Sequence, residues 1–238
     1  MSYLYIKKPA PTPKSKSAAK KKLLAGLFLC FGLIFLSSAI LPIIKFQLLY
    51  SANFTQLINP LSFQGTNAQN ILGAVTTDYT QINNWFDTGS SDSNQIFSNN
   101  NNFTYLLSIP KLKISNAVVT VGSMDLKKSL IQYPQTALPG QLGNTVIFGH
   151  STLTQFYSSK NYLTIFSTLY TLKQGDEILI DYDNVQYEYI VDEMFEVKPT
   201  DLSVLEQRFD QKNLTLITCS PPGTILRRLI IKSSLAVK

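Results

Sequence analysis

Short apolar runs, separated by Gly, Pro, Asn and Asp, fill the chain from residue 105 onward. Runs rich in Val, Ile, Tyr and Phe that alternate with polar positions are typical of strands. The pattern predicts strands over 106–109, 117–121, 145–149, 177–182, 185–197, 215–218 and 229–233. It predicts short helices only over 125–131, 162–169 and 201–208. Because so little helix is left for repeated βαβ units, we expect an all-β barrel or sandwich.

A single long apolar segment lies before this region. The residues from Leu23 to Ile44 include no charged side chain, and a helix of that length spans a bilayer core of about 30 Å. Lysines are concentrated ahead of it, at positions 7, 8, 14, 16, 20, 21 and 22. The positive-inside rule then predicts a cytoplasmic tail and an exported remainder. A cleaved signal peptide is the alternative, because Ser37-Ser38-Ala39 offers small residues, but the apolar run continues beyond a usual cleavage region.

Four parts of the chain follow from these patterns. We expect a cytoplasmic basic tail over 1–22, a transmembrane anchor over 23–44, a polar extracellular stalk or linker over 45–104 and a folded domain over 105–238. The stalk is assigned from its Asn, Gln, Ser and Thr content and its scattered apolar residues.

The net charge of +6 comes from the lysines of the tail, and the rest of the chain is close to neutral. A nucleic-acid-binding domain carries its basic residues on a folded face. We therefore expect a lipid bilayer as partner of residues 23–44, and no nucleic acid.

Candidate chemistry rests on three residues. Outside the apolar segment the chain has a single cysteine, Cys219, and in all it has a single histidine, His150, each at the end of a strand-like run. A thiol next to an imidazole is the usual pair for nucleophilic catalysis, and the guanidinium of Arg228 can stabilise an oxyanion. Its neighbour Arg227 faces the other side of a strand. Burial as a plain core residue is the alternative for Cys219, which has no disulfide partner outside the membrane segment.

Four ordered motifs carry a family resemblance. The strand Leu214-Thr215-Leu216-Ile217-Thr218-Cys219, followed nine residues later by Arg228, resembles the sortase signature. So do Thr136-Ala137-Leu138-Pro139-Gly140, the stretch from Gly143 to His150, and the entry strand from Leu107 to Ile114. The resemblance covers about residues 105 to 235.

The resemblance implies an all-β, closed sortase-type barrel of about eight strands with a few short helices, outside the membrane. It implies cleavage of a sorting peptide of the Leu-Pro-any-Thr-Gly (LPxTG) kind after its threonine, and transfer to an amine acceptor such as a cell-wall peptide. Cys219 would be the nucleophile, His150 the general acid and base, and Arg228 the oxyanion or substrate clamp. Thr218, Ser220 and Pro221 would border the substrate groove. Trp85-Phe86-Asp87 differs from the Asp-Pro-aromatic lid motif of pilus-building members, which favours another branch.

Two other functions fit the same residues. A hydrolytic cysteine peptidase would release its product to water, and an inactive membrane-anchored binding or structural domain would keep the barrel alone. No cofactor is expected, since one histidine and one exported cysteine cannot supply the ligands of zinc. Calcium held by loop carboxylates is compatible with the resemblance, but no ligand can be assigned.

Overall fold

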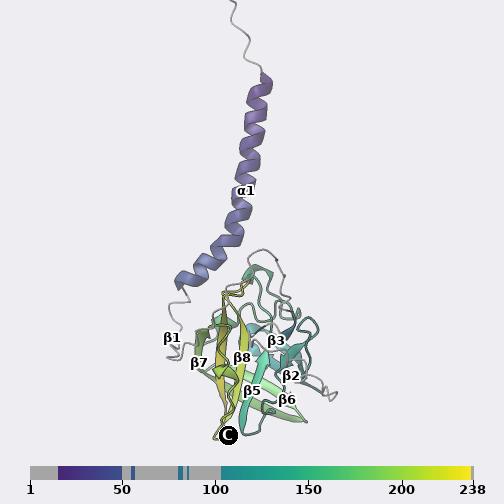
Figure 1. Ribbon diagram of the computed structural model, residues 1–238. Coiled ribbons are helices and arrows are strands. Elements are labelled where there is room, and N and C mark those ends of the chain that lie inside the picture. Colours follow the sequence, from purple (N-terminus) through teal and green to yellow (C-terminus); the bar gives the residue numbers. More distant parts are fainter. Residues whose placement is uncertain (1–15, 50–54, 57–79, 83–84, 86–102, 237–238) are drawn as a thin grey trace, which may run out of the picture. The chain divides into compact units, whose positions relative to one another are not determined.

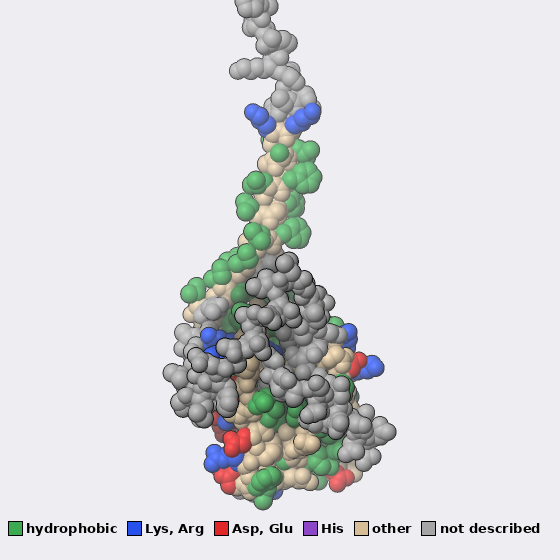
Figure 2. All heavy atoms as spheres, in the orientation of Figure 1, with side chains coloured by type: hydrophobic (Ala, Val, Ile, Leu, Met, Phe, Trp, Pro, Cys, Tyr) green, Lys and Arg blue, Asp and Glu red, His purple; other side chains and the backbone are tan. Residues whose placement is uncertain are grey.

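The computed structural model describes residues 16–49, 55–56, 80–82, 85 and 103–236 (Figure 1). The chain divides into two compact units, Met1–Leu41 and Pro42–Lys238. The helix α1, Lys16–Leu49, crosses the boundary between them. Its segment Lys21–Phe46 is long and apolar enough to cross a membrane, a test that an amino-terminal signal sequence also passes. Hydrophobic side chains cover α1 in Figure 2, with basic ones at its amino-terminal end, so α1 is the membrane-anchor candidate expected at 23–44.

The second unit holds a β-barrel. Its strands are β1 (Thr55–Gln56), β2 (Thr104–Ile109), β3 (Ile114–Val121), β4 (Leu130–Gln132), β5 (Gly143–Phe148), β6 (Glu177–Tyr182), β7 (Val185–Val197), β8 (Lys212–Ser220) and β9 (Arg227–Leu235). Short 3₁₀ turns lie between them: η3 (Pro110–Leu112), η4 (Thr154–Phe156), η5 (Leu169–Thr171) and η6 (Ser203–Leu205).

The long strand β7 closes the barrel. The strands follow the order β7-β6-β2-β3-β4-β5-β8-β9, and β9 pairs back onto β7. Residues 185–190 of β7 pair with β6, while residues 189–197 pair with β9. A closed ring of eight strands leaves few unpaired edges, and the two-residue β1 adds to β7 at Phe195 and Glu196. This is the closed barrel that the sequence predicted.

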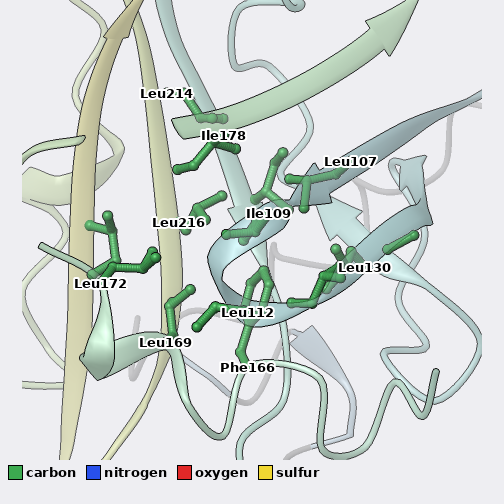
Figure 3. Packing of buried hydrophobic residues seen from close by; sticks show 14 of the residues in the cluster. Leu107, Ile109, Leu112, Leu130, Phe166, Leu169, Leu172, Ile178, Leu214 and Leu216 are labelled. Carbon is green, nitrogen blue, oxygen red and sulfur yellow. The ribbon is translucent and has the colours of Figure 1, made fainter. Parts of the chain in front are cut away.

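Two apolar clusters lie on the two faces of the sheet. The interior cluster includes Leu107, Ile109, Ile178, Leu214 and Leu216, all with no more than trace exposure, and Figure 3 shows them pointing toward one another. A second cluster covers the outer face of β4, β5, β8, β9 and the end of β7: Ile131, Val146, Phe148, Phe195, Val197, Ile217, Cys219 and Ile230. The two faces alternate along each strand, so Cys219 belongs to the outer face.

The sequence predicted most of these strands. The predicted β6 and β7 match the observed bounds, because a turn at Asp183-Asn184 separates two alternating runs. The helix expected over 125–131 is wrong: residues 130–132 form β4, parallel to β3. All three residues of β4 are buried, so the strand shows no alternation to distinguish it from a helix. Of the other two expected helices, only the turns η5 and η6 form in the same regions.

Parts of the predicted stalk lie against the barrel. Besides β1, Gln81 forms an isolated bridge with Asp125. Ile82 and Trp85 belong to the outer-face cluster, with 2% and 0% exposure. Residues 80–82 and 85 therefore cover part of the outer face of the barrel.

Candidate active site

The sheet register brings the three predicted catalytic residues into one row. On β8 and β9, Cys219 pairs directly with Arg228. On β5, Phe148 pairs with Ile217 in a parallel register, so His150 and Cys219 each lie two residues beyond a matched pair. Neighbouring strands lie about 4.8 Å apart. Thiol, imidazole and guanidinium thus come from adjacent positions at the same end of the barrel.

Backbone contacts fix this row. The hydroxyl of Thr218 donates to the carbonyl oxygen of Gly149 at 2.7 Å, and the Gly149 N–H donates to Ile217. Phe166 N–H donates to the carbonyl of His150 at 3.0 Å. The Ser151 hydroxyl donates to the carbonyl of Cys219 at 2.8 Å. The chain is therefore held on both sides of the His150 side chain.

Trp85 covers the row from outside. Its indole ring packs edge-on against Phe148, with ring centroids 5.5 Å apart, and lies 5.8 Å from the ring of His150. The guanidinium carbon of Arg228 is 5.2 Å from the indole centroid. In consequence the exposed fractions are 4% for Cys219, 9% for His150 and 1% for Arg228.

Arg228 also binds the backbone of the covering segment. Its Nη2 donates to the carbonyl oxygen of Trp85 at 2.8 Å. Its Nη1 donates to the carbonyl oxygens of Ile225 and Arg227, each at 3.2 Å. A buried guanidinium thus donates to a peptide carbonyl right beside the thiol, which is the kind of contact that an acyl-transfer substrate requires.

Two backbone hydrogen bonds attach the covering segment to the loop before β4, and a third lies within the segment. Ile82 N–H donates to Met124 at 3.1 Å, Leu126 N–H donates to Thr80 at 3.0 Å, and Trp85 N–H closes a local turn onto Ile82 at 3.0 Å. Sequence reasoning missed Trp85 because it lies in a long segment rich in Asn, Gln, Ser and Thr. The available signal was that the chain's single tryptophan, a residue usually buried, stands in a segment assigned as a solvated stalk.

Burial controls the protonation of the Cys219 thiol. Desolvation raises the pKa of Cys219 above its ordinary value, and the positive charge of Arg228 opposes that shift. Burial disfavours the thiolate more than the guanidinium favours it. With Trp85 in place the cysteine is therefore a protonated, poorly reactive thiol at neutral pH.

The two adjacent arginines face opposite sides of β9, as expected. Arg227 lies 3.5 Å from the buried carboxylate of Glu196, which also accepts a hydrogen bond from Ser220 at 2.5 Å. Arg227, whose side chain is 41% exposed, is thus the ion-pair partner of Glu196. Only Arg228 shares the face of Cys219.

The residues predicted to border the groove are placed differently. Thr218 and Ser220 alternate with Cys219 on β8, and their hydroxyls bond Gly149 and Glu196 on the other face. Pro221 is buried at the start of the following loop. In this structure these three residues support the cysteine strand from behind, and none is exposed on the outer face. Among the described residues, no group of three His, Cys, Asp or Glu side chains lies close enough to hold a metal ion.

Comparison with known proteins identifies the family of the barrel domain. The family model for the sortase domain matches residues 107–236. The chain is 33% identical over 128 residues to sortase A of Staphylococcus aureus, a match that covers 47% of this chain and 58% of that protein.

Solved structures give the same fold. Sortase A from Corynebacterium diphtheriae, as a lid mutant, superposes with a TM-score of 0.51 at 26% identity, over 59% of this chain and 74% of that one. Sortase C-1 from Actinomyces oris gives a TM-score of 0.50 at 25% identity, over 56% and 73%. With a matching domain model across more than half of its length, the chain belongs to the sortase family.

Proposed function

We propose that this protein is a membrane-anchored cysteine transpeptidase that cuts an LPxTG-type sorting peptide after its threonine and joins that threonine to an amine. Cys219 passes its thiol proton to His150 as its sulfur attacks the scissile carbonyl carbon, and His150 then gives that proton to the nitrogen of the departing amine as the C–N bond breaks. The thioester is then attacked by the acceptor amine, whose proton passes to His150, and the thiolate of Cys219 leaves. The acceptor is an amine of a cell-wall peptide.

A single observation carries this proposal. The guanidinium of Arg228 already donates to a main-chain carbonyl, that of Trp85, next to the cysteine with which it is paired in the sheet. A substrate carbonyl bound in the same way would have its developing negative charge stabilised. The covering segment thus occupies the place that the proposal gives to the substrate.

It follows that residues 80–82 and 85 must move away before a peptide binds. Removing the indole restores water to the thiol and lowers the desolvation that raises its pKa, while the charge of Arg228 stays beside it. The displaced state therefore has the more reactive cysteine.

The anchor sets where the reaction takes place. We propose that α1 spans the membrane with its lysine-rich start in the cytoplasm, which puts the barrel outside. Substrates are then exported proteins that carry a sorting signal.

The test uses the full-length protein in detergent with an LPxTG-containing peptide and triglycine. Mass spectrometry should detect a threonine–triglycine ligation product, and Cys219→Ala should abolish it. A product that ends in a free threonine carboxylate, with no ligation at saturating triglycine, would instead indicate a hydrolytic peptidase. A chain that forms no thioester, even after Trp85→Ala, would indicate a binding or structural domain.

A further inference from the structure

A polar pocket lies on the same outer face as the catalytic row, toward the other end of the barrel. Its volume is about 460 Å³. The pocket borders Thr215 on β8 and Lys232 on β9, which pair with each other. Because β9 descends to the carboxyl terminus at the foot of the barrel in Figure 1, the pocket is toward that foot and Cys219 is toward the opposite end.

The strand register gives the distance between pocket and nucleophile. Thr215 and Lys232 are each four residues from the paired Cys219 and Arg228. Four residues of strand cover about 13 Å, and even spacing keeps all four side chains on one face. An extended peptide has the same rise, so a peptide whose scissile carbonyl meets Cys219 can reach the pocket with the residue four positions away.

The surface between the two sites is apolar. Ile217 and Ile230 pair with each other midway, and both belong to the outer-face cluster. Going from the foot upward, this face therefore has a polar pocket, then an apolar pair, then the nucleophile. A peptide with apolar residues next to its cleavage site and a polar residue beyond them matches that order.

The floor of the pocket is polar and buried. Asn144 and Thr215 have exposed fractions of 7% and 1%. Thr215 donates to the side-chain oxygen of Asn144 at 2.7 Å. Ser233 also borders the pocket, but it pairs with Leu214 and alternates with Lys232, so its side chain belongs to the interior face of the sheet.

The rim carries surplus negative charge. It consists of four carboxylates and two cations: Asp192, Glu193, Glu206 and Asp210, with Arg208 and Lys232. Lys232 pairs with Glu193 at 3.5 Å, and Arg208 pairs with Asp210 at 3.8 Å. Asp192 and Glu206 have no cation within 4 Å among the residues described here. The rim therefore favours a positively charged group.

We propose that this pocket is a subsite for a lysine or arginine of the sorting peptide, one or two residues before the leucine of its LPxTG motif. The inference rests on the proposed function, which places the threonine carbonyl at Cys219. The part of the peptide before the scissile bond, which becomes the acyl group of the thioester, is the part that reaches the pocket. The leaving amine and the incoming amine both use His150 and share the region beside it. A subsite for the acyl part also holds the peptide during the lifetime of the thioester.

The test compares three peptides that differ only at the two positions before the motif: Lys-Lys, Ala-Ala and Glu-Glu. With the full-length protein and triglycine, kcat/KM for cleavage should be about fivefold higher for Lys-Lys than for Ala-Ala, and lowest for Glu-Glu. The preference should shrink in 0.5 M salt, since screening weakens exposed charge pairs. In the double variant Asp192→Asn, Glu206→Gln the ratio should approach one. Glu177→Gln, an exposed carboxylate on β6 outside the pocket, should keep the wild-type ratio.

The outcomes separate the two proposals. If all three peptides are cleaved equally well, the pocket inference is overturned while the transpeptidase proposal stands. If none is cleaved, the transpeptidase proposal fails, and the pocket is tested through the Kd of the same labelled peptides for the Cys219→Ala protein, measured by fluorescence anisotropy. A Lys-Lys preference that the double variant removes supports a basic-peptide site, and equal affinities overturn it.

Discussion

Arg227 and Arg228 are neighbours in sequence, yet the barrel gives them different partners. Arg227 is part of an ion pair with Glu196, behind the cysteine strand. Arg228 is fully buried on the side of Cys219, below the indole of Trp85. The alternation of side chains along β9 separates the two, so substitution of each should have a different effect.

We expect Arg228→Ala to lower kcat/KM for peptide cleavage by about two orders of magnitude, since losing one oxyanion donor costs about 3 kcal/mol. Arg227→Ala is the matched control and should have a much smaller effect on kcat/KM, together with a loss of stability from leaving Glu196 buried without its cation. Kinetics of both variants, with thermal unfolding alongside, check this. A larger kinetic loss in Arg227→Ala would mean that the other arginine serves the substrate.

The titration of Cys219 gives a second prediction at this scale. The pKa of the thiol is raised by burial and held down in part by Arg228. The pH at which alkylation by iodoacetamide becomes fast should therefore lie above that of a free cysteine. This pH should be lower in Trp85→Ala, because that substitution removes burial, and higher still than in the wild type in Arg228→Ala, because that substitution removes the cation.

Mass spectrometry of the alkylated protein in a Cys30→Ser background measures this, because Cys30 is the only other thiol in the chain. Folding favours the protonated thiol of Cys219. The contribution of this group to the free energy of unfolding is therefore present below the pKa of the unfolded thiol, and it is lost as the pH rises through the raised pKa of the folded state. Equal pH profiles for the wild type and Trp85→Ala would show that the indole does not control the thiol. Resistance of the wild type to alkylation alone does not indicate an inactive barrel, because the covering segment accounts for it.

At the scale of elements, the end of β5 positions the imidazole. A Cβ added to Gly149 would lie 2.4 Å from the Phe166 ring and 2.7 Å from Leu130. Glycine at this position thus lets the strand pass close to its neighbours just before His150. We expect Gly149→Ala to cost about 1–3 kcal/mol of stability through overpacking, and to lower kcat/KM further by shifting His150.

The matched control for that variant is Ile178→Val in the interior cluster, with an expected cost of about 0.5–1.5 kcal/mol and no shift of the imidazole. Thermal unfolding and peptide cleavage are measured for both, at a temperature where each is fully folded. If Gly149→Ala loses stability but keeps wild-type kcat/KM, the end of β5 does not hold His150 in its working position.

The same elements explain how far the sequence could be interpreted. Cys219, His150 and Arg228 were identified because each is a rare or charged residue at the end of a predictable strand, and the register then brought them together. The resemblance placed Thr218 and Ser220 at the groove, but successive residues of a strand face opposite sides, and both side chains point away from the face of Cys219. Trp85 was missed because its indole packs against residues distant in sequence, Phe148, His150 and Arg228, and the polar segment around it gives no local signal for such packing.

For the whole molecule, the covering segment links exposure of the thiol to the state of residues outside the family domain. The domain match begins at residue 107, while Ile82 and Trp85 belong to the compact unit Pro42–Lys238 and bury part of its outer-face cluster. On the outer side of the membrane, where we propose that the barrel lies, an exposed reactive thiol is open to oxidation. Burial beneath Trp85 protects Cys219 in the covered state.

This arrangement predicts that two fragments, 42–238 and 103–238, differ in thermal stability and in the reactivity of Cys219. The shorter fragment lacks Ile82 and Trp85, so Phe148, Ile217 and Ile230 lose their cover. Losing one buried tryptophan costs about 3–5 kcal/mol, which should lower Tm by about 6–20 °C. The exposed apolar patch should bind a hydrophobic dye, and Cys219 should be alkylated at least about tenfold faster at pH 7.

Fragment 42–238 with Trp85→Ala is the control, and it should reproduce most of the gain in alkylation if the indole is the cover. Equal Tm and equal alkylation of the two fragments would mean that the residues before the barrel do not cover the site in solution.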